Sequence, residues 1–87
     1  MVRFTLHFSP NIIKRRLNWN LKKSKTYTVL VTHGEVLIVY QKNISASDAI
    51  DLAIQNLNGM KAEYLNEYHN VTLYTEDDHY GISIIED

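Results

Sequence analysis

Four histidines are the first residues to examine for chemistry, because imidazole is the commonest metal ligand among protein side chains. They are His7, His33, His69 and His79. No two of them have the H-x-x-x-H or H-E-x-x-H spacing that places two zinc ligands on one helix face. The chain has no cysteine, so a thiolate metal site and a thiol nucleophile are excluded. We therefore expect no metal site and no cofactor.

The other catalytic residue types show no pattern either. No serine stands in a G-x-S-x-G sequence, and the three glycines lie far apart, so no phosphate-binding loop is present. The acidic run 76–78 could hold a divalent ion, but such a run more often forms a solvated turn. We therefore expect a protein that is not an enzyme.

Charge is divided unequally along the chain. Residues 1–34 carry seven lysines and arginines and no acid, whereas residues 35–87 carry two lysines and ten acids. The two parts, +7 and −8, add up to the net charge of −1. Three interpretations remain: the halves neutralise each other in the fold, the basic half binds an acidic partner, or copies of the chain associate.

A basic segment surrounds the single tryptophan. Cations bind phosphates irrespective of base sequence, and an exposed tryptophan can stack on a base. The segment thus predicts, as an alternative function, a small nucleic-acid-binding protein that uses residues 14–25. A buried tryptophan among solvated lysines would give the same pattern. The candidate nucleic-acid-binding residues are Lys14, Arg15, Arg16, Trp19, Lys22, Lys23 and Lys25.

Acids and tyrosines gather in the C-terminal half. Tyrosine is frequent at protein interfaces, where it offers a large contact area with few rotatable bonds, and carboxylates steer a basic partner. The alternative is that several of these tyrosines cap the core. The candidate partner-binding residues are Glu63, Tyr64, Glu67, Tyr68, Tyr74, Glu76, Asp77, Asp78 and Tyr80.

Alternating apolar residues and β-branched runs predict strands at 2–8, 26–32, 35–41, 71–75 and 79–85. A two-residue His33-Gly34 turn would join the second and third as a hairpin. The unbroken apolar run 36–40 indicates a central strand that is covered on both faces.

One principal helix is predicted over about 45–67. Ser45 and Asp48 form a capping box, and the apolar residues of 46–57 follow the helical period. Asn58-Gly59 predicts a stop or a kink, but Met60, Tyr64 and Tyr68 would continue the stripe. Segment 11–25 is ambiguous, and we expect a short helical turn near 10–16 followed by extended chain.

These elements predict an α+β fold, with residues 1–87 as a single small domain. Its mainly antiparallel sheet has four to five strands, and the helix packs on one face, with a parallel crossover from Ile38 to Val71. The predicted core is Phe4, Leu6 or Phe8, Val29, Val31, Leu37, Val39, Ile50, Ala53, Ile54, Leu57, Val71, Leu73, Ile82 and Ile84.

Small size, segregated charge and many asparagines, tyrosines and isoleucines are typical of accessory proteins of phages and mobile elements. We therefore expect a non-enzymatic protein that binds a larger protein stoichiometrically. The specific class that we expect is an inhibitor of a host defence nuclease, such as an anti-CRISPR protein. No apolar run is long enough to span a membrane, so we expect a cytoplasmic protein. A homodimer is compatible with the charge pattern.

Overall fold

The computed structural model describes residues 6–76 and 80–87. The elements along the chain are β1 (His7–Phe8), α1 (Pro10–Asn20), β2 (Thr26–His33), β3 (Val36–Ser45), α2 (Ala46–Leu57), β4 (Ala62–Glu67), β5 (Asn70–Thr75) and β6 (Tyr80–Glu86). None of the helices in these residues is long and apolar enough to cross a membrane.

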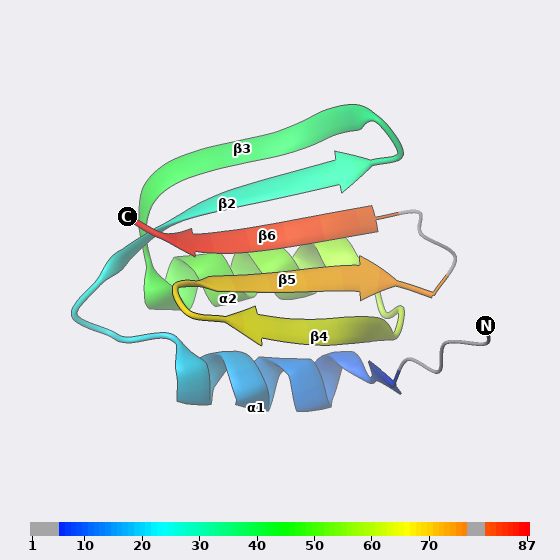
Figure 1. The fold of residues 1–87 in the computed structure, drawn as a ribbon, viewed down its shortest axis with the longest axis horizontal. Helices are drawn as coiled ribbons and strands as arrows, with labels where there is room; N and C mark the ends of the chain where they lie inside the picture. Colours follow the sequence, from blue (N-terminus) through cyan, green and yellow to red (C-terminus); the bar gives the residue numbers. More distant parts are fainter. Residues whose placement is uncertain (1–5, 77–79) are drawn as a thin grey trace.

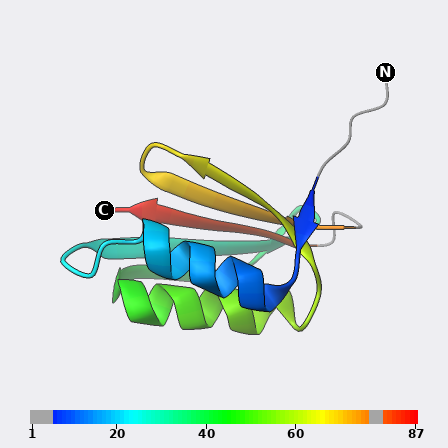
Figure 2. The ribbon, with the colours of Figure 1, turned by 90° about the horizontal axis from the view of Figure 1, so that it is seen from below.

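The strands form one sheet in the order β1-β4-β5-β6-β2-β3, and each neighbouring pair is antiparallel. Both helices lie side by side on one face of the sheet (Figures 1 and 2). The predicted α+β class is thus confirmed, with six strands and two helices in place of four to five strands and one helix. The predicted crossover from Ile38 to Val71 is wrong, because β5, which holds Val71, runs antiparallel to β3; α2 instead joins β3 to β4, which runs in the same direction as β3 but is not its neighbour.

Helix α1 is longer than the predicted turn. Ser9 caps it, since its hydroxyl accepts a hydrogen bond from the backbone N–H of Ile12, and Pro10 begins it. Ile13 and Leu17 lie one turn apart and are both fully buried. Burial of Leu17 favours helix beyond residue 16 by more than the weak helix propensities of Asn18 and Asn20 oppose it.

The predicted helix over 45–67 is wrong in its second half. Helix α2 ends at Leu57, where Asn58 and Gly59 adopt left-handed conformations with φ of 52° and 80°. The chain then returns as strand β4, which pairs with β5. A spacing of four residues fits a strand as well as a helix, because four is also a multiple of two. The stripe through Tyr64 therefore did not discriminate between them.

The predicted hairpin of β2 and β3 is present, but its turn is shifted by one residue. The last strand pair is His33 opposite Val36, so the loop is Gly34-Glu35. Gly34 has a φ of 62°, and Glu35 has no positive φ. Positive φ at only the first of two loop residues is the pattern of a type II′ turn, which favours glycine there.

Strand β3 lies at an edge of the sheet and is not the central strand that its apolar run predicted. Its residues Val36, Leu37 and Ile38 are 63%, 52% and 47% exposed. Among the described residues, β1 and β3 are the edge strands, and the interior positions belong to β4, β5, β6 and β2. Leu37 is therefore wrong as a core residue, because it pairs with Thr32 and lies on the face of the sheet that the helices leave open.

The core lies between the sheet and the two helices. Of the residues predicted there, Phe4 lies outside the described residues, Leu6 is exposed, and Phe8, Val39 and Ile54 are partly buried against the core. The other predicted residues except Leu37 are buried. The prediction missed Ile13, Leu17, Leu21, Tyr27, Ala46, Ala49 and Ala62, which are also buried.

Candidate functional site

The outer side of α1 and the loop after it form a surface of cations around Trp19. Because Ile13 and Leu17 turn toward the core, Arg15 and Trp19 must point away from it. The indole of Trp19 is 88% exposed. We call this the basic surface; its residues, all exposed, are Lys14, Arg15, Trp19, Lys22, Lys23 and Lys25.

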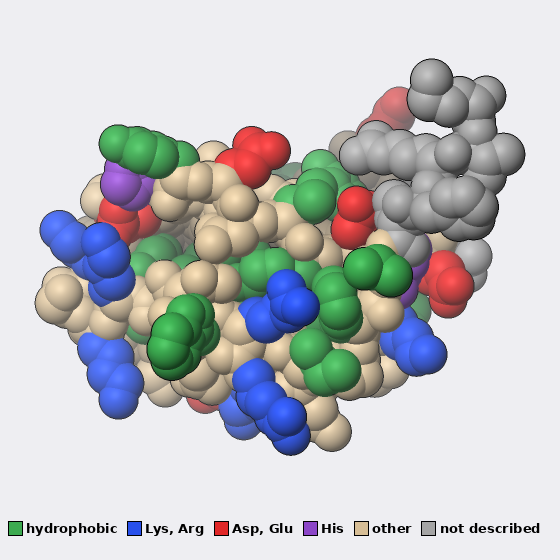
Figure 3. Space-filling view, turned by 60° about the horizontal axis from the view of Figure 1, so that its bottom comes forward, with side chains coloured by type: hydrophobic (Ala, Val, Ile, Leu, Met, Phe, Trp, Pro, Cys, Tyr) green, Lys and Arg blue, Asp and Glu red, His purple; other side chains and the backbone are tan. Residues whose placement is uncertain are grey.

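The cations of the basic surface are not neutralised by ion pairs. Within residues 6–76 and 80–87, no lysine or arginine pairs with a carboxylate, and the ion pair there joins His69 to Glu86. Figure 3 shows Lys and Arg side chains spread over this side of the molecule, while the acids in view lie mainly along its upper rim. In the described part of the chain, the predicted neutralisation of one half by the other does not occur through direct contacts.

Arg16 differs from the other predicted basic residues. Its guanidinium lies 4.3 Å from the ring centroid of Phe8 and 5.6 Å from that of Tyr64. The Tyr64 hydroxyl accepts a hydrogen bond of 2.7 Å from the Asn20 amide. Burial raises the pKa of Tyr64, and the Asn20 hydrogen bond and the nearby Arg16 charge partly oppose this. These contacts fasten α1 to β4.

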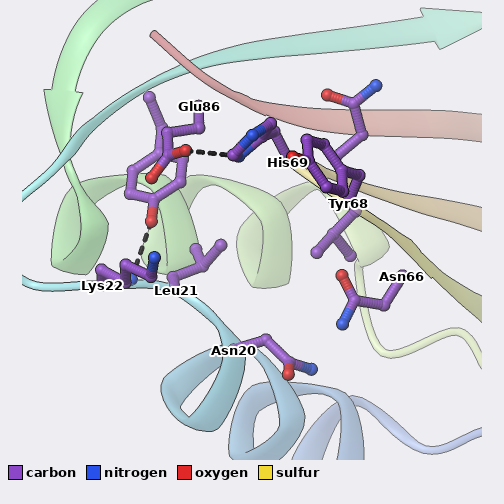
Figure 4. A pocket seen from close by; sticks show the side chains of 10 residues that line it. Asn20, Leu21, Lys22, Asn66, Tyr68, His69 and Glu86 are labelled. Carbon is purple, nitrogen blue, oxygen red and sulfur yellow. Dashed lines mark hydrogen bonds and ion pairs between the residues drawn. The ribbon is translucent and has the colours of Figure 1, made fainter.

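A hollow of about 280 Å³ adjoins the end of the basic surface. Lys22 and Asn20 line it from α1 and the loop that follows, while Asn66, Tyr68 and His69 line it from β4 and the β4–β5 turn (Figure 4). The structure therefore brings Lys22 of the predicted basic set next to Tyr68 of the predicted acidic and aromatic set.

Hydrogen bonds hold the walls of this hollow. The Lys22 backbone N–H donates to the Tyr27 hydroxyl at 2.7 Å, and His69 Nδ1 lies 2.6 Å from the Glu86 carboxylate. The Tyr68 ring packs edge-on against His69, with centroids 4.1 Å apart, yet remains 96% exposed. The Asn66 side-chain amide makes no hydrogen bond with the described residues. Its donor and acceptor are thus available to a ligand.

A second hollow, of about 440 Å³, lies between the end of α1 and the start of α2. Asn18 and Lys23 line its α1 side, and Ser45, Ala46 and Ser47 line its α2 side. The N-terminal turn of a helix carries partial positive charge. Asp48 in that turn opposes this charge, so the cation that the hollow shares with the basic surface is Lys23.

The predicted acidic and aromatic residues do not form one patch. Glu63 and Tyr74 are directly opposite each other on β4 and β5, and by strand alternation they share with Glu67 the sheet face that the helices leave open. Tyr64 lies on the other face. Tyr68 occupies the β4–β5 turn, and is not on a helix with Tyr64.

The remaining predicted residues lie at the opposite end of β5. Glu76 is exposed directly after that strand. Tyr80 is partly buried and stacks on His33 with ring centroids 4.7 Å apart. Asp77 and Asp78 lie outside the described residues. A six-residue strand, roughly 17–20 Å long, therefore separates this group from Tyr68.

The polar residues of the first hollow were missed by the sequence prediction. Asn20, Asn66, His69 and Glu86 come from three segments, α1, the β4–β5 hairpin and β6, and no local spacing connects these segments. His69 meets Glu86 because Asn70 pairs with Ile85, which places the two side chains at adjoining ends of β5 and β6. Only the antiparallel register of these strands could have indicated the pair.

No known protein-family model matches the chain, and neither the curated proteins nor the solved structures contain a match to it. Among the described residues, no group of three histidines or acids is arranged to hold a metal ion.

Proposed function

We propose that this protein is a non-enzymatic binding protein whose basic surface binds single-stranded nucleic acid. The observation that carries the proposal is Trp19, whose indole is 88% exposed among five exposed cations. Exposing an indole forgoes the favourable burial of one of the largest apolar side chains. A partner that stacks on the ring would recover that free energy.

The kind of cation favours nucleic acid over a protein partner. Four of the five cations are lysines, a residue that is depleted at protein interfaces. Phosphate backbones, in contrast, attract lysine and arginine alike and release counterions on binding. One exposed aromatic ring among several cations is the arrangement by which single strands are held without base specificity.

The hollow beside Lys22 supports the same proposal. The exposed Tyr68 ring offers a second stacking surface, and the Asn20 and Asn66 amides can meet the polar edge of an unpaired base. A single-stranded nucleic acid that runs along α1 with one base stacked on Trp19 would place a following base toward this hollow.

Tryptophan fluorescence tests the proposal directly, because Trp19 is the only tryptophan in the chain. Titration with a 12-nucleotide oligo(dT) or oligo(rU) at low salt should quench its emission as a base stacks on the indole. The Trp19→Ala variant should lose about 1–3 kcal/mol of binding free energy, measured by fluorescence anisotropy of a labelled oligonucleotide. The Trp19→Phe variant should retain part of it.

Charge variants supply the matched control. Replacing Lys22, Lys23 and Lys25 with glutamine should lower the salt slope of the affinity by up to about 0.7 for each phosphate that is no longer neutralised. Replacing Lys42 and Lys61, which lie outside the basic surface, should leave the slope unchanged. The proposal is wrong if Trp19 emission does not change with any oligonucleotide at low salt, or if both sets of variants reduce the slope equally per lysine.

The second candidate function is the stoichiometric inhibition of a larger protein, in its concrete form an anti-CRISPR-like inhibitor of a nuclease. It is favoured by Glu63, Glu67 and Tyr74 on the open sheet face, where carboxylates and an aromatic ring can meet a basic groove. A pull-down from host extract with the wild-type chain should then recover a nucleic-acid-handling protein. The Glu63→Lys, Glu67→Lys double variant should fail to recover it.

A further inference from the structure

Strand β3 presents an unpaired edge with an unusual surface. In the part of the chain that the structure describes, it pairs with β2 on one side and has no strand on the other. Natural edge strands are usually protected against pairing by lysine, proline, β-bulges or short length, and β3 has two register shifts against β2, at Tyr27/Val29 and at Val31/Thr32. Strand β3 has ten residues, and no charge or proline interrupts residues 36–41. Such an edge is a template for another strand.

A register shift in β3 places Leu37 and Tyr40 on the same face of the sheet. Thr32 pairs with Leu37, and Leu30 pairs with Tyr40, so one extra residue lies in β3 between these pairs. Leu30 and Thr32 are two positions apart on β2 and share a face of the sheet. Leu37 and Tyr40 therefore share that face too, although they are three residues apart.

We infer that the partner of this edge is the β3 strand of a second copy of the chain, in antiparallel orientation. A two-fold axis through the middle of residues 37–40 sets Leu37 of one copy opposite Tyr40 of the other, on one face. Both side chains, 52% and 51% exposed in the single chain, would then be covered. The result is a continuous twelve-stranded sheet with an isologous interface.

Charge complementarity supports a second copy in this orientation. The apolar run is flanked by Glu35 on one side and Lys42 on the other, and both are exposed. In the antiparallel pair, Glu35 of each copy lies beside Lys42 of its partner, which gives two favourable contacts at the rim. In a parallel pair, like charges would meet at both ends instead.

Sedimentation equilibrium tests this inference. At about 100 µM, a range in which a dimer of micromolar Kd is populated, the wild-type chain should show twice its mass of 10.1 kDa and dissociate on dilution. The Leu37→Lys, Ile38→Lys double variant should shift the dissociation constant at least about tenfold toward monomer, since it removes the apolar contacts with Tyr40 and Val39 of the second copy and adds two positive charges per copy along the shared edge. The matched control is Ile12→Lys, the same type of exchange at a partly exposed isoleucine on α1.

A charge exchange tests orientation without altering the apolar run. Lys42→Glu alone should weaken the dimer, and the Glu35→Lys, Lys42→Glu double variant should restore it. Far-UV circular dichroism and the melting temperature of each variant report whether it folds. A wild-type chain that stays monomeric at millimolar concentration overturns the inference. So does a dimer that persists in the Leu37→Lys, Ile38→Lys variant or one that the charge exchange does not rescue.

The inferred dimer is independent of the proposed nucleic-acid binding. The basic surface lies on α1, which packs against α2 and β4, whereas β3 lies at the far edge of the sheet. Variants of β3 should therefore leave the Trp19 fluorescence change with oligo(dT) at monomer concentrations intact. Failure of either proposal can thus be recognised separately.

Discussion

Two residues of α1, only two positions apart, show how one helix divides its roles between core and surface. Leu17 is fully buried, and Trp19 is 88% exposed. We expect Leu17→Ala to lower the free energy of unfolding by roughly 2–5 kcal/mol, because it removes buried methyl groups and leaves a cavity. Trp19→Ala should change it by no more than about 0.5 kcal/mol. Urea denaturation of both variants checks this, and a large loss of stability in Trp19→Ala would mean that the indole serves the fold.

The Tyr64 hydroxyl connects α1 to β4 through its hydrogen bond from Asn20. We expect Tyr64→Phe to cost about 0.5–1.5 kcal/mol at pH 8, because the Asn20 amide loses its acceptor at a half-buried site. The Asn20→Ala variant should lose a similar amount. In the Tyr64→Phe background, Asn20→Ala should then add little, and full additivity of the two losses would contradict the contact.

The pKa of Tyr64 adds a pH dependence to that contact. Burial raises its pKa above the ordinary value of 10.0, so the folded chain keeps the phenol proton to higher pH than the unfolded chain. The stabilisation is therefore fully present below pH 10.0 and is lost as the pH rises through the folded pKa. The stability difference between wild type and Tyr64→Phe should shrink above pH 10, as measured by urea denaturation at a series of pH values. A difference that stays constant up to pH 12 would contradict this.

Local sequence predicts an element best where capping, period and turn chemistry agree. Ser45 and the periodic residues after it indicated the start and inner face of α2, and the structure confirms both. Asn58-Gly59 was indicated as a stop or a kink, and the helix does end there, but the spacing through Tyr64 suits either period and favoured a helix that continues to about residue 67. For α1, the buried Leu17 extends the helix beyond what propensity indicates, which is a tertiary effect.

A single substitution measures how much the N-cap of α2 contributes to the free energy of unfolding. The Ser45 hydroxyl accepts a hydrogen bond of 3.1 Å from the backbone N–H of Asp48. We expect Ser45→Ala to lower the free energy of unfolding by about 1 kcal/mol, since one N–H at the helix start loses its partner. Ser47→Ala, at an exposed position within the same helix, should have almost no effect or stabilise slightly. Thermal melts compare the two, and equal losses would mean that Ser45 does not act as a cap.

At the scale of the whole molecule, the sequence indicated the hairpin of β2 and β3 but not the order of the other strands in the sheet. The apolar run in β3 looks like an interior strand, yet β3 is at the edge and β2 is interior. An apolar run in a sequence indicates a surface that favours contact with other apolar groups. It does not show whether those groups belong to the same chain or to a second one. The hollow beside Lys22 was beyond prediction for the same reason, because its walls come from segments that only the strand order brings together. The charges of the basic surface were predictable, since they lie within residues 14–25 and the charge asymmetry is visible in the sequence, but the sequence left open whether Trp19 is buried or exposed.

Hydrogen exchange of the backbone amides should reveal the strand order. We expect the slowest exchange in β2 and β6, which pair with each other and hold Val29, Val31, Ile82 and Ile84, all fully buried. In the two-residue β1, exchange should be fast, because a short terminal pairing opens at little cost.

In β3, the amides that point away from β2 should exchange quickly in dilute solution and slow down as the protein concentration rises, because a second copy would cover them. NMR measured at two concentrations separates these cases. Protection of β3 that is equal to that of β2 in the monomer would contradict the edge position, and rates in β3 that do not depend on concentration would contradict the pairing of two copies.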